Sequence, residues 1–339
     1  MPQPSEAALE EQLAAPTPAL VRAMGGLDGD IVVLGAGGKM GPSLARLAVR
    51  ASEAAGAKRH VFAVSRFRDE ALRARLDDWG VRTIACDLLD ADAVANLPDA
   101  PHVVYMVGQK FGTTGDGATT WALNTVAPAV AAERYRRSRI VAFSTGNVYP
   151  LWTADSQGPT EDDLVGPVGE YAWSALARER VLTWHSTKHG TPMVILRLNY
   201  AVEPRYGVLR DIADRVHAGL PVDLTMGAVN VIWQRDANAV ALMALACAAS
   251  PPLVLNVTGP RHSVRWIAEE FGRRFVKPVV FQGAEASTAL LSDASRAWEL
   301  FGQPEAGIDE MIDRVAEWVT GGGRSLGKPT HFEEREGKF

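Results

Sequence analysis

Three glycines spaced three residues apart follow a short apolar run near the N-terminus, and this pattern constrains the fold more than any other. Residues 31–34 (Ile-Val-Val-Leu) suit a buried strand, and leucines and alanines recur at helical spacing over 42–50. Glycine permits a tight turn and a close backbone approach, and a helix N-terminus offers free N–H groups to phosphates. We therefore expect the first unit of a dinucleotide-binding fold. The expected cofactor loop comprises Gly35, Gly38, Lys39, Met40 and Gly41.

Short apolar runs alternate with amphipathic stretches through the first 200 residues. The candidate strands are 60–65, 81–86, 102–107, 139–144 and 193–198, and the candidate helices are 70–79, 119–135 and 171–188. Continuous apolar strands separated by helices are typical of a parallel sheet that is covered on both faces. We predict an α/β fold, a Rossmann doubly wound parallel sheet with a smaller C-terminal substrate-binding lobe.

The pattern also suggests where the chain divides. We expect a Rossmann domain over 28–200, with 234–258 adding a helix and a strand, a substrate lobe from 201–233 and 259–320, an N-terminal extension over 1–27, and a tail over 321–339. The tail begins at three consecutive glycines. Chain ends of this kind are either flexible or dock on a partner subunit.

Composition excludes several classes of function. The 339 residues carry a net charge of −5 without a dense basic stripe, which argues against a nucleic-acid partner. No apolar run is long enough to span a membrane, and the N-terminus resembles no signal peptide. Cys86 and Cys247 lie in apolar contexts, as expected of reduced thiols in a cytoplasmic protein. The seven histidines show no metal-ligand spacing, and Cys-x-x-Cys is absent, so we expect no metal site.

The ends of the next strands bear on the choice of cofactor. An NAD site usually places an acidic residue after the second strand, whereas an NADP site favours arginine near the 2′-phosphate. Here Ser65 and Arg66 stand at that point, which favours NADP over NAD, although Arg66 also fits an ordinary solvated position. The remaining candidate cofactor contacts are Asp87 and Leu88 after the third strand, Val107 and Gly108 after the fourth, and Asn124 within the stretch 119–135. Asp87 is alternatively a helix cap.

The order of these motifs resembles the extended short-chain dehydrogenase/reductase family, which includes nucleotide-sugar epimerases and dehydratases. The resemblance runs from about residue 30 to 319. The matching positions are Gly35, Gly38 and Gly41, Asn124 within 121–125, Thr145 within 143–149, Tyr171 at a helix start, Asp236, and 255–259. Several landmarks in the right order are more specific than any one of them.

The resemblance implies how catalysis is arranged. Tyr171 would exchange a proton with the substrate oxygen, and the Thr145 hydroxyl would bond the same atom. In the family, a lysine four residues after the tyrosine binds the cofactor ribose and lowers the pKa of the phenol, which otherwise lies near 10. Here Ala175 occupies that position.

Three interpretations of Ala175 stay open. Another cation substitutes for the lysine, either Arg178 from the next helical turn or Lys110 from the loop after the fourth strand. Alternatively, Tyr171 works without a cation. In the third interpretation, the protein binds the dinucleotide without chemistry and senses redox state.

The substrate is less constrained. Family dehydratases carry an Asp-Glu pair directly after the catalytic threonine, but Gly146 and Asn147 stand here, which disfavours dehydration. A phosphate-binding arginine typical of nucleotide-sugar enzymes is also missing from 227–230. The candidate substrate contacts are Asn147, Asn199, Tyr200 and Arg205, and Asn199 alternatively satisfies buried backbone.

These observations predict an NAD(P)-dependent oxidoreductase or epimerase. Its substrate would be a small polyhydroxylated or acidic molecule, such as a sugar, sugar acid or lactone, and the alternative is a non-catalytic NADP-binding regulator. Family members often dimerise through the two helices that correspond to 119–135 and 171–188, so the resemblance implies a homodimer.

Overall fold

A seven-stranded parallel sheet forms the centre of the protein. The computed structural model describes residues 5–110 and 115–338. The strands run in the order β3-β2-β1-β4-β5-β7-β12, and all neighbours are parallel. Their bounds are β1 Ile31–Leu34, β2 Val61–Ser65, β3 Arg82–Ala85, β4 His102–Tyr105, β5 Arg139–Thr145, β7 Met193–Leu198 and β12 Leu253–Val257. This order confirms the predicted doubly wound Rossmann sheet.

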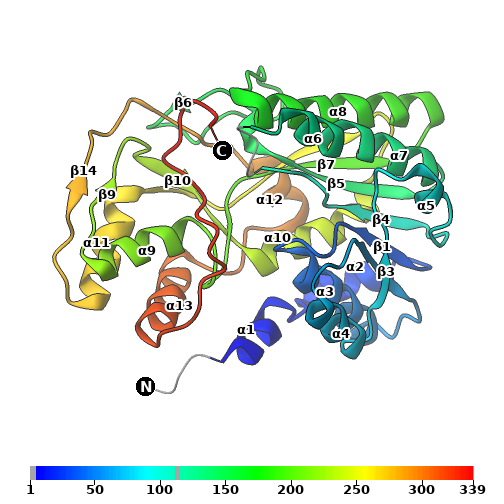
Figure 1. Ribbon diagram of the computed structural model, residues 1–339, viewed down its shortest axis with the longest axis horizontal. Coiled ribbons are helices and arrows are strands. Elements are labelled where there is room, and N and C mark those ends of the chain that lie inside the picture. The colour runs from blue at the N-terminus through cyan, green and yellow to red at the C-terminus, as the bar shows by residue number, and fades with distance from the viewer. Residues whose placement is uncertain (1–4, 111–114, 339) are drawn as a thin grey trace.

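Helices cover both faces of the sheet (Figure 1). On one face lie α2 (Pro18–Gly25), α3 (Gly41–Ala54), α4 (Glu70–Asp78) and α10 (Gln234–Met243). The other face carries α5 (Ala91–Ala95), α6 (Gly117–Trp121), a π-helical turn (Ala122–Val126), α7 (Ala127–Arg134) and α8 (Gly169–His189). The predicted helix 119–135 is therefore interrupted by the π-turn, which contains Asn124.

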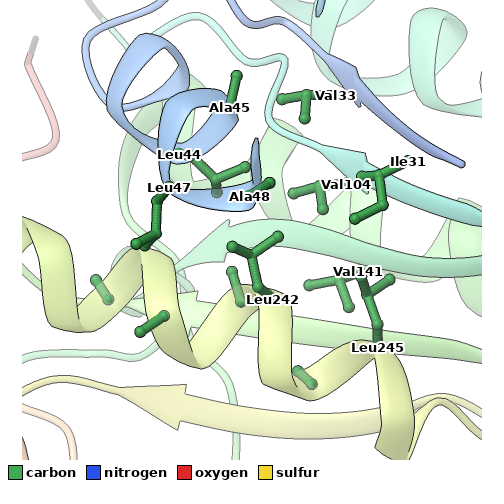
Figure 2. Close-up of a cluster of buried hydrophobic side chains, with 14 of the residues drawn as sticks. Ile31, Val33, Leu44, Ala45, Leu47, Ala48, Val104, Val141, Leu242 and Leu245 are labelled. Atoms are coloured by element: carbon green, nitrogen blue, oxygen red, sulfur yellow. The ribbon is translucent and has the colours of Figure 1, made fainter. Parts of the chain in front are cut away.

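The main core lies between the sheet and the first helical layer. Figure 2 shows Leu44 and Leu47 of α3 together with Leu242 of α10, packed toward β1, β4 and β5. The apolar periodicity of α3 thus places its buried face on the sheet. This packing fixes the N-terminus of α3 at the carboxyl edge of β1, where ligands bind in such folds.

A second hydrophobic core lies beside the sheet and comes mainly from later residues. It is built by α9 (Val208–Ala218), α11 (Val264–Phe275) and α13 (Ile308–Thr320) (Figure 1). Small two-stranded pairings connect the intervening segments: β6 (Trp152–Thr153) with β15 (Thr288–Ala289), β8 (Ala201–Val202) with β11 (Ile232–Trp233), β9 (Val222–Asp223) with β14 (Phe281–Gln282), and β10 (Ala228–Asn230) with β13 (Arg261–Ser263). The short helix α12 (Ser295–Phe301) precedes α13.

Both ends of the chain dock on its own folded part. Leu9 and Leu13 of α1 (Glu6–Leu13) are buried in the second core. The tail after α13 crosses between the two cores and reaches the start of α8 (Figure 1). Phe332 buries its side chain on the way, and the Arg335 guanidinium donates to the carbonyls of Thr225 and Thr288, at 3.0 and 2.8 Å. The tail therefore packs on its own chain, which differs from the expected flexible tail, whereas docking on a partner subunit stays a prediction.

None of the helices in the described ranges combines the length and the apolar character that a membrane crossing requires.

Candidate active site

One cavity of about 350 Å³ brings the predicted motifs together. Its walls come from the glycine loop, the ends of β4, β5 and β7, the first turns of α8, and the C-terminal tail. Predicted site residues that line it are Gly35, Gly38, Lys39, Met40, Gly41, Gly108, Lys110, Thr145, Asn147, Tyr171, Arg178, Asn199 and Tyr200. Residues separated by more than 100 positions in the sequence thus share one wall.

The glycine loop has the geometry that a dinucleotide pyrophosphate requires. Gly35 has a φ of 88° and donates its N–H to the carbonyl of Val64 at 2.8 Å, so the chain turns tightly at the end of β1. A Cβ at Gly41 would lie 2.5 Å from the Ala36 carbonyl oxygen, so α3 packs close to the strand. No side chain caps the α3 N-terminus. Its free N–H groups therefore face the cavity and fit phosphate groups.

The Tyr171 phenol lines this cavity beside the Thr145 hydroxyl. Tyr171 stands at the start of α8 and forms a side-chain hydrogen bond with Thr145, at the end of β5. Burial raises the pKa of the Tyr171 phenol, while the charge of Arg178 and the bond with Thr145 act in the opposite direction. The phenol therefore carries its proton at neutral pH, as a general acid must.

Arg178 is held rigidly in the cavity wall. Its guanidinium donates to the Phe143 carbonyl at 2.8 Å and to the side-chain oxygen of Asn124. A Cβ at Gly108 would lie 2.4 Å from its Nη2 atom, so only glycine leaves room for the guanidinium there. Ala175, by contrast, is fully buried in a small apolar cluster with Val148. The cation on this face of α8 thus comes from Arg178.

Asn124 positions its neighbours without lining the cavity. Its side-chain oxygen also accepts the N–H of Gln109 at 3.1 Å, and its amide donates to the Ser174 hydroxyl at 2.8 Å. The π-turn of residue 124 therefore connects the loop after β4 to α8 and Arg178. A π-turn inside a helix often marks a functional site.

Three lysines surround the part of the cavity that faces the second core. The Lys39 Nζ atom lies 3.3 Å from the centre of the Tyr206 ring. The Lys110 Nζ atom lies 5.9 Å from the centre of the Tyr171 ring and 3.4 Å from the Thr330 carbonyl oxygen. Lys328 of the tail completes the group.

Burial lowers the pKa values of two of these lysines, and neighbouring positive charges add to the effect at Lys39. Burial, with the neighbouring charges of Lys110 and Lys328, lowers the pKa of Lys39 to about 7. Burial likewise lowers the pKa of Lys110 to about 8, although Asp211 opposes the shift. Clustered cations of this kind suit an anionic ligand, which would restore their charged form.

Not every predicted residue lies at this cavity. Ser65 lies against the glycine loop, since a Cβ at Gly37 would be 2.5 Å from its hydroxyl oxygen. Arg66 and Asp87 are exposed at the ends of β2 and β3. Leu88 is buried in the core, and Val107 packs over Gly35. The structure gives none of these residues a place in the cavity wall, and the positions of Ser65 and Arg66 are those expected of adenosine-ribose contacts.

The predicted substrate contacts divide into two groups. Asn199 faces Gly146, where a Cβ would lie 1.9 Å from the Asn199 side-chain oxygen, and it bonds Ser292. Asn147 and Tyr200 also line the cavity. Arg205 does not, because its buried guanidinium is held by the carboxylates of Glu203 and Glu10, each at 2.9 Å.

Arg197, which neighbours these candidates in the sequence, is likewise structural. Its buried side chain pairs with Glu179 at 2.8 Å and donates to the Tyr149 hydroxyl at 2.7 Å. Glu179 also accepts a hydrogen bond from Ser144 at 2.6 Å, next to Thr145. This network fixes the end of β5, where Thr145 lies.

Sequence reasoning missed the contribution of the tail. Lys328 and Thr330 line the cavity, and Thr330 is fixed by two hydrogen bonds to Asp211, at 2.7 Å from the backbone and 2.6 Å from the hydroxyl. The only sequence signal was a lysine and a threonine in a charged tail. Sequence reasoning also did not single out His185 and His189, which are one helical turn apart and lie near Glu133.

The comparisons with known proteins agree with this geometry. Residues 31–242 match the model of the NAD dependent epimerase/dehydratase family. The chain belongs to this family. No curated protein matches the sequence. As a member of the NAD-dependent epimerase/dehydratase family, the protein is an enzyme of an NAD-dependent type, in agreement with the resemblance drawn from its motifs.

Solved structures share the fold at low sequence identity. UDP-glucuronic acid 4-epimerase from Bacillus cereus, in complex with UDP-glucuronic acid and NAD, superposes with a TM-score of 0.72 at 18% identity, over 86% of this chain and 99% of that chain. UDP-glucose 4-epimerase from Thermotoga maritima, with UDP-glucose, superposes with a TM-score of 0.70 at 16% identity, over 86% of this chain and 98% of that chain. UDP-glucose 4-epimerase from Thermus thermophilus, with NAD, superposes with a TM-score of 0.69 at 21% identity, over 86% of this chain and 99% of that chain.

Proposed function

We propose that this family member is an NAD(P)-dependent oxidoreductase or epimerase for a small polyhydroxylated substrate with an acidic group, such as a sugar acid. One observation carries the proposal: the Tyr171–Thr145 pair shares a single cavity with the glycine loop and with the lysine group of Lys39, Lys110 and Lys328. The Tyr171–Thr145 pair and the cofactor held by the glycine loop supply redox chemistry at a hydroxyl or carbonyl. The lysine group supplies recognition of an anion.

The glycine loop, the Tyr171–Thr145 pair and Arg178 each have a distinct task in this proposal. The glycine loop holds the cofactor pyrophosphate, and the nicotinamide, when bound, supplies the hydride chemistry. Tyr171 gives its proton to the carbonyl oxygen that is being reduced, or takes it back in the reverse direction, and Thr145 bonds the same oxygen. The fixed charge of Arg178 stabilises the phenolate form of Tyr171, which is the task of the family's lysine.

Two observations favour a small acidic substrate over a nucleotide-diphosphate sugar. The tail contributes Lys328 and Thr330 to the cavity wall, where they offer a cation and a hydroxyl to an acidic, hydroxylated ligand. The segment 227–230 offers no cation for a diphosphate. An acidic sugar is also the ligand named for the B. cereus neighbour, there as part of a nucleotide sugar.

For the cofactor we propose NADP in preference to NAD. The exposed Arg66 follows Ser65 directly at the end of β2, where an acidic residue would otherwise hold the ribose hydroxyls. An arginine at this point suits a 2′-phosphate.

We also propose a homodimer through α6, α7 and α8, the helices on the face of the sheet opposite α3. Their outer faces expose large apolar side chains, namely Trp121, Val126, Trp173 and Trp184, of which both of the last two are more than half exposed. A contiguous apolar surface on a folded chain often marks a protein interface. Sedimentation would report a dimer for the native protein and a monomer for Trp173→Glu with Trp184→Glu.

The second candidate is a regulator that binds NADP without turnover, and the buried Ala175 in place of lysine is the observation that favours it. Absorbance of reduced nicotinamide, followed with a panel of sugars, sugar acids and lactones, separates the two. The enzyme proposal predicts turnover with acidic members of the panel and its loss in Tyr171→Phe. Cofactor binding with no turnover across the panel would favour the regulator.

A further inference from the structure

Two histidines, one buried and one partly exposed, lie on the side of α8 that faces Glu133 of α7, in a part of the fold that the proposed reaction does not use. His185 and His189 are four residues apart and therefore lie on one face of the helix. Glu133, near the end of α7, projects toward both rings, because α7 packs along α8. The three residues thus come from two adjacent helices.

The imidazole nitrogens that face Glu133 are left without hydrogen-bond partners among the described residues. These atoms are Nδ1 of His185 and Nε2 of His189, and both are shielded from solvent. The His185 side chain is nine-tenths buried. A buried polar atom without a partner is unfavourable, so two such atoms directed at the same carboxylate indicate that a ligand binds between them.

The spacing of the three ligand atoms matches a coordinated metal better than direct hydrogen bonds. The Glu133 Oε2 atom lies 3.5 Å from His189 Nε2 and 3.9 Å from His185 Nδ1, and all three ligand atoms lie within 4.8 Å of one another. Ligands at about 2.1 Å from a tetrahedral zinc ion are separated by roughly 3.4 Å. An ion between them would thus need only small side-chain movements.

We propose that Glu133, His185 and His189 bind one Zn²⁺ ion per chain, with water as the fourth ligand. Two neutral imidazoles and a carboxylate are a ligand set that zinc favours. Arg136 donates to the other carboxylate oxygen of Glu133 at 3.2 Å, which leaves Oε2 directed at the histidines. The ion would join α7 to α8 and so stabilise the layer that carries Tyr171 at its other end.

Charged side chains and an aromatic ring surround His185. Glu133 favours the charged form of His185, whereas burial, His189 and Lys188 lower the pKa of His185, burial being the largest effect. The Trp184 ring packs edge-on against His185, with centres 4.8 Å apart.

The test uses the full-length protein, stripped with a chelator and titrated with Zn²⁺ against a chromogenic competitor. The native chain should bind one ion and melt several degrees higher with zinc than without it. His189→Gln, which alters a partly exposed ring at the end of the helix, should weaken zinc binding at least 10-fold with an unchanged circular dichroism spectrum. Glu133→Gln should act in the same direction.

A matched control and a spectroscopic measurement complete the design. His217→Gln, on α9, should bind zinc as the native chain does. Cobalt(II) should give the intense visible bands of a tetrahedral site in the native protein and in His217→Gln, but not in His189→Gln. The absence of stoichiometric zinc binding, or equal binding by His189→Gln and the native chain, would overturn the proposal. If Cys86 and Cys247 bound the zinc instead, His189→Gln would bind it as well as the native chain does.

Discussion

The guanidinium of Arg178 donates a hydrogen bond to the side-chain oxygen of Asn124, which fixes a positive charge in the wall of the cavity that Tyr171 lines. The two residues come from α8 and from the π-turn before α7. The same guanidinium leaves no space for a side chain at position 108. We propose that this arginine, two turns after the tyrosine, contributes the charge that the family's lysine would supply one turn after it.

Replacing Arg178 by methionine should raise the pKa of Tyr171, because the charge that opposes the effect of burial is lost. We expect kcat to fall by about 10- to 100-fold, within the usual range for a group that assists proton transfer, and the alkaline limb of the pH–rate profile to move upward. Arg178→Lys should recover part of the rate. Arg180→Met, an exposed change on the same helix, is the control, and an unshifted profile in Arg178→Met would contradict this role.

Lys328 should determine the affinity for an acidic substrate. Lys328→Ala removes one of three cations from the cavity wall, so KM for a sugar acid should rise by about 10-fold, as for the loss of one charge-assisted contact. KM for the cofactor should stay the same. Lys338→Ala changes a fully exposed lysine of the same tail and should leave both constants unchanged. Equal KM values in native protein and Lys328→Ala would remove the tail from substrate recognition.

The binding of an acidic substrate should weaken as the pH rises from about 7 to 9. Lys39 and Lys110 lose their protons in this window, since their pKa values are about 7 and about 8. The free energy of unfolding should change in the opposite direction, because the unfolded chain keeps these protons up to about pH 10 and so binds more of them. Urea unfolding and KM at several pH values measure both trends. Lys39→Met should reduce the pH dependence of both quantities, whereas Lys58→Met, which alters an exposed lysine, should leave it unchanged.

Much of the fold is predictable from short-range patterns. The strand 193–198 is found at the predicted position because it is a continuous apolar run that the core buries. The glycine motif likewise specifies its own turn. Such features depend on residues that are close together in the sequence.

The missed features depend on contacts between distant segments. Arg205 was expected to bind substrate, but Glu10, 195 residues away, pairs with it instead. Lys328 lines the cavity only because Thr330 bonds Asp211, which lies 119 residues earlier. Local sequence patterns carry no information about either pairing.

Arg66 should govern the choice between the two dinucleotides. Arg66→Ala removes the only cation directly after Ser65, so Kd for NADP should rise by about 10-fold or more while Kd for NAD changes little. Arg68→Ala, also exposed, serves as the control. Equal losses for both cofactors in Arg66→Ala would contradict the preference for NADP.

The most direct test of the account compares Tyr171→Phe with the native enzyme in the same reduced-nicotinamide absorbance measurement. Only the hydroxyl that bonds Thr145 is removed, so the cofactor should bind with unchanged affinity while turnover of the acidic substrate falls by about 100- to 10,000-fold. Cofactor binding, followed by fluorescence in the same samples, shows that the site is intact. Turnover at the native rate in Tyr171→Phe would contradict the central claim that this phenol exchanges the proton.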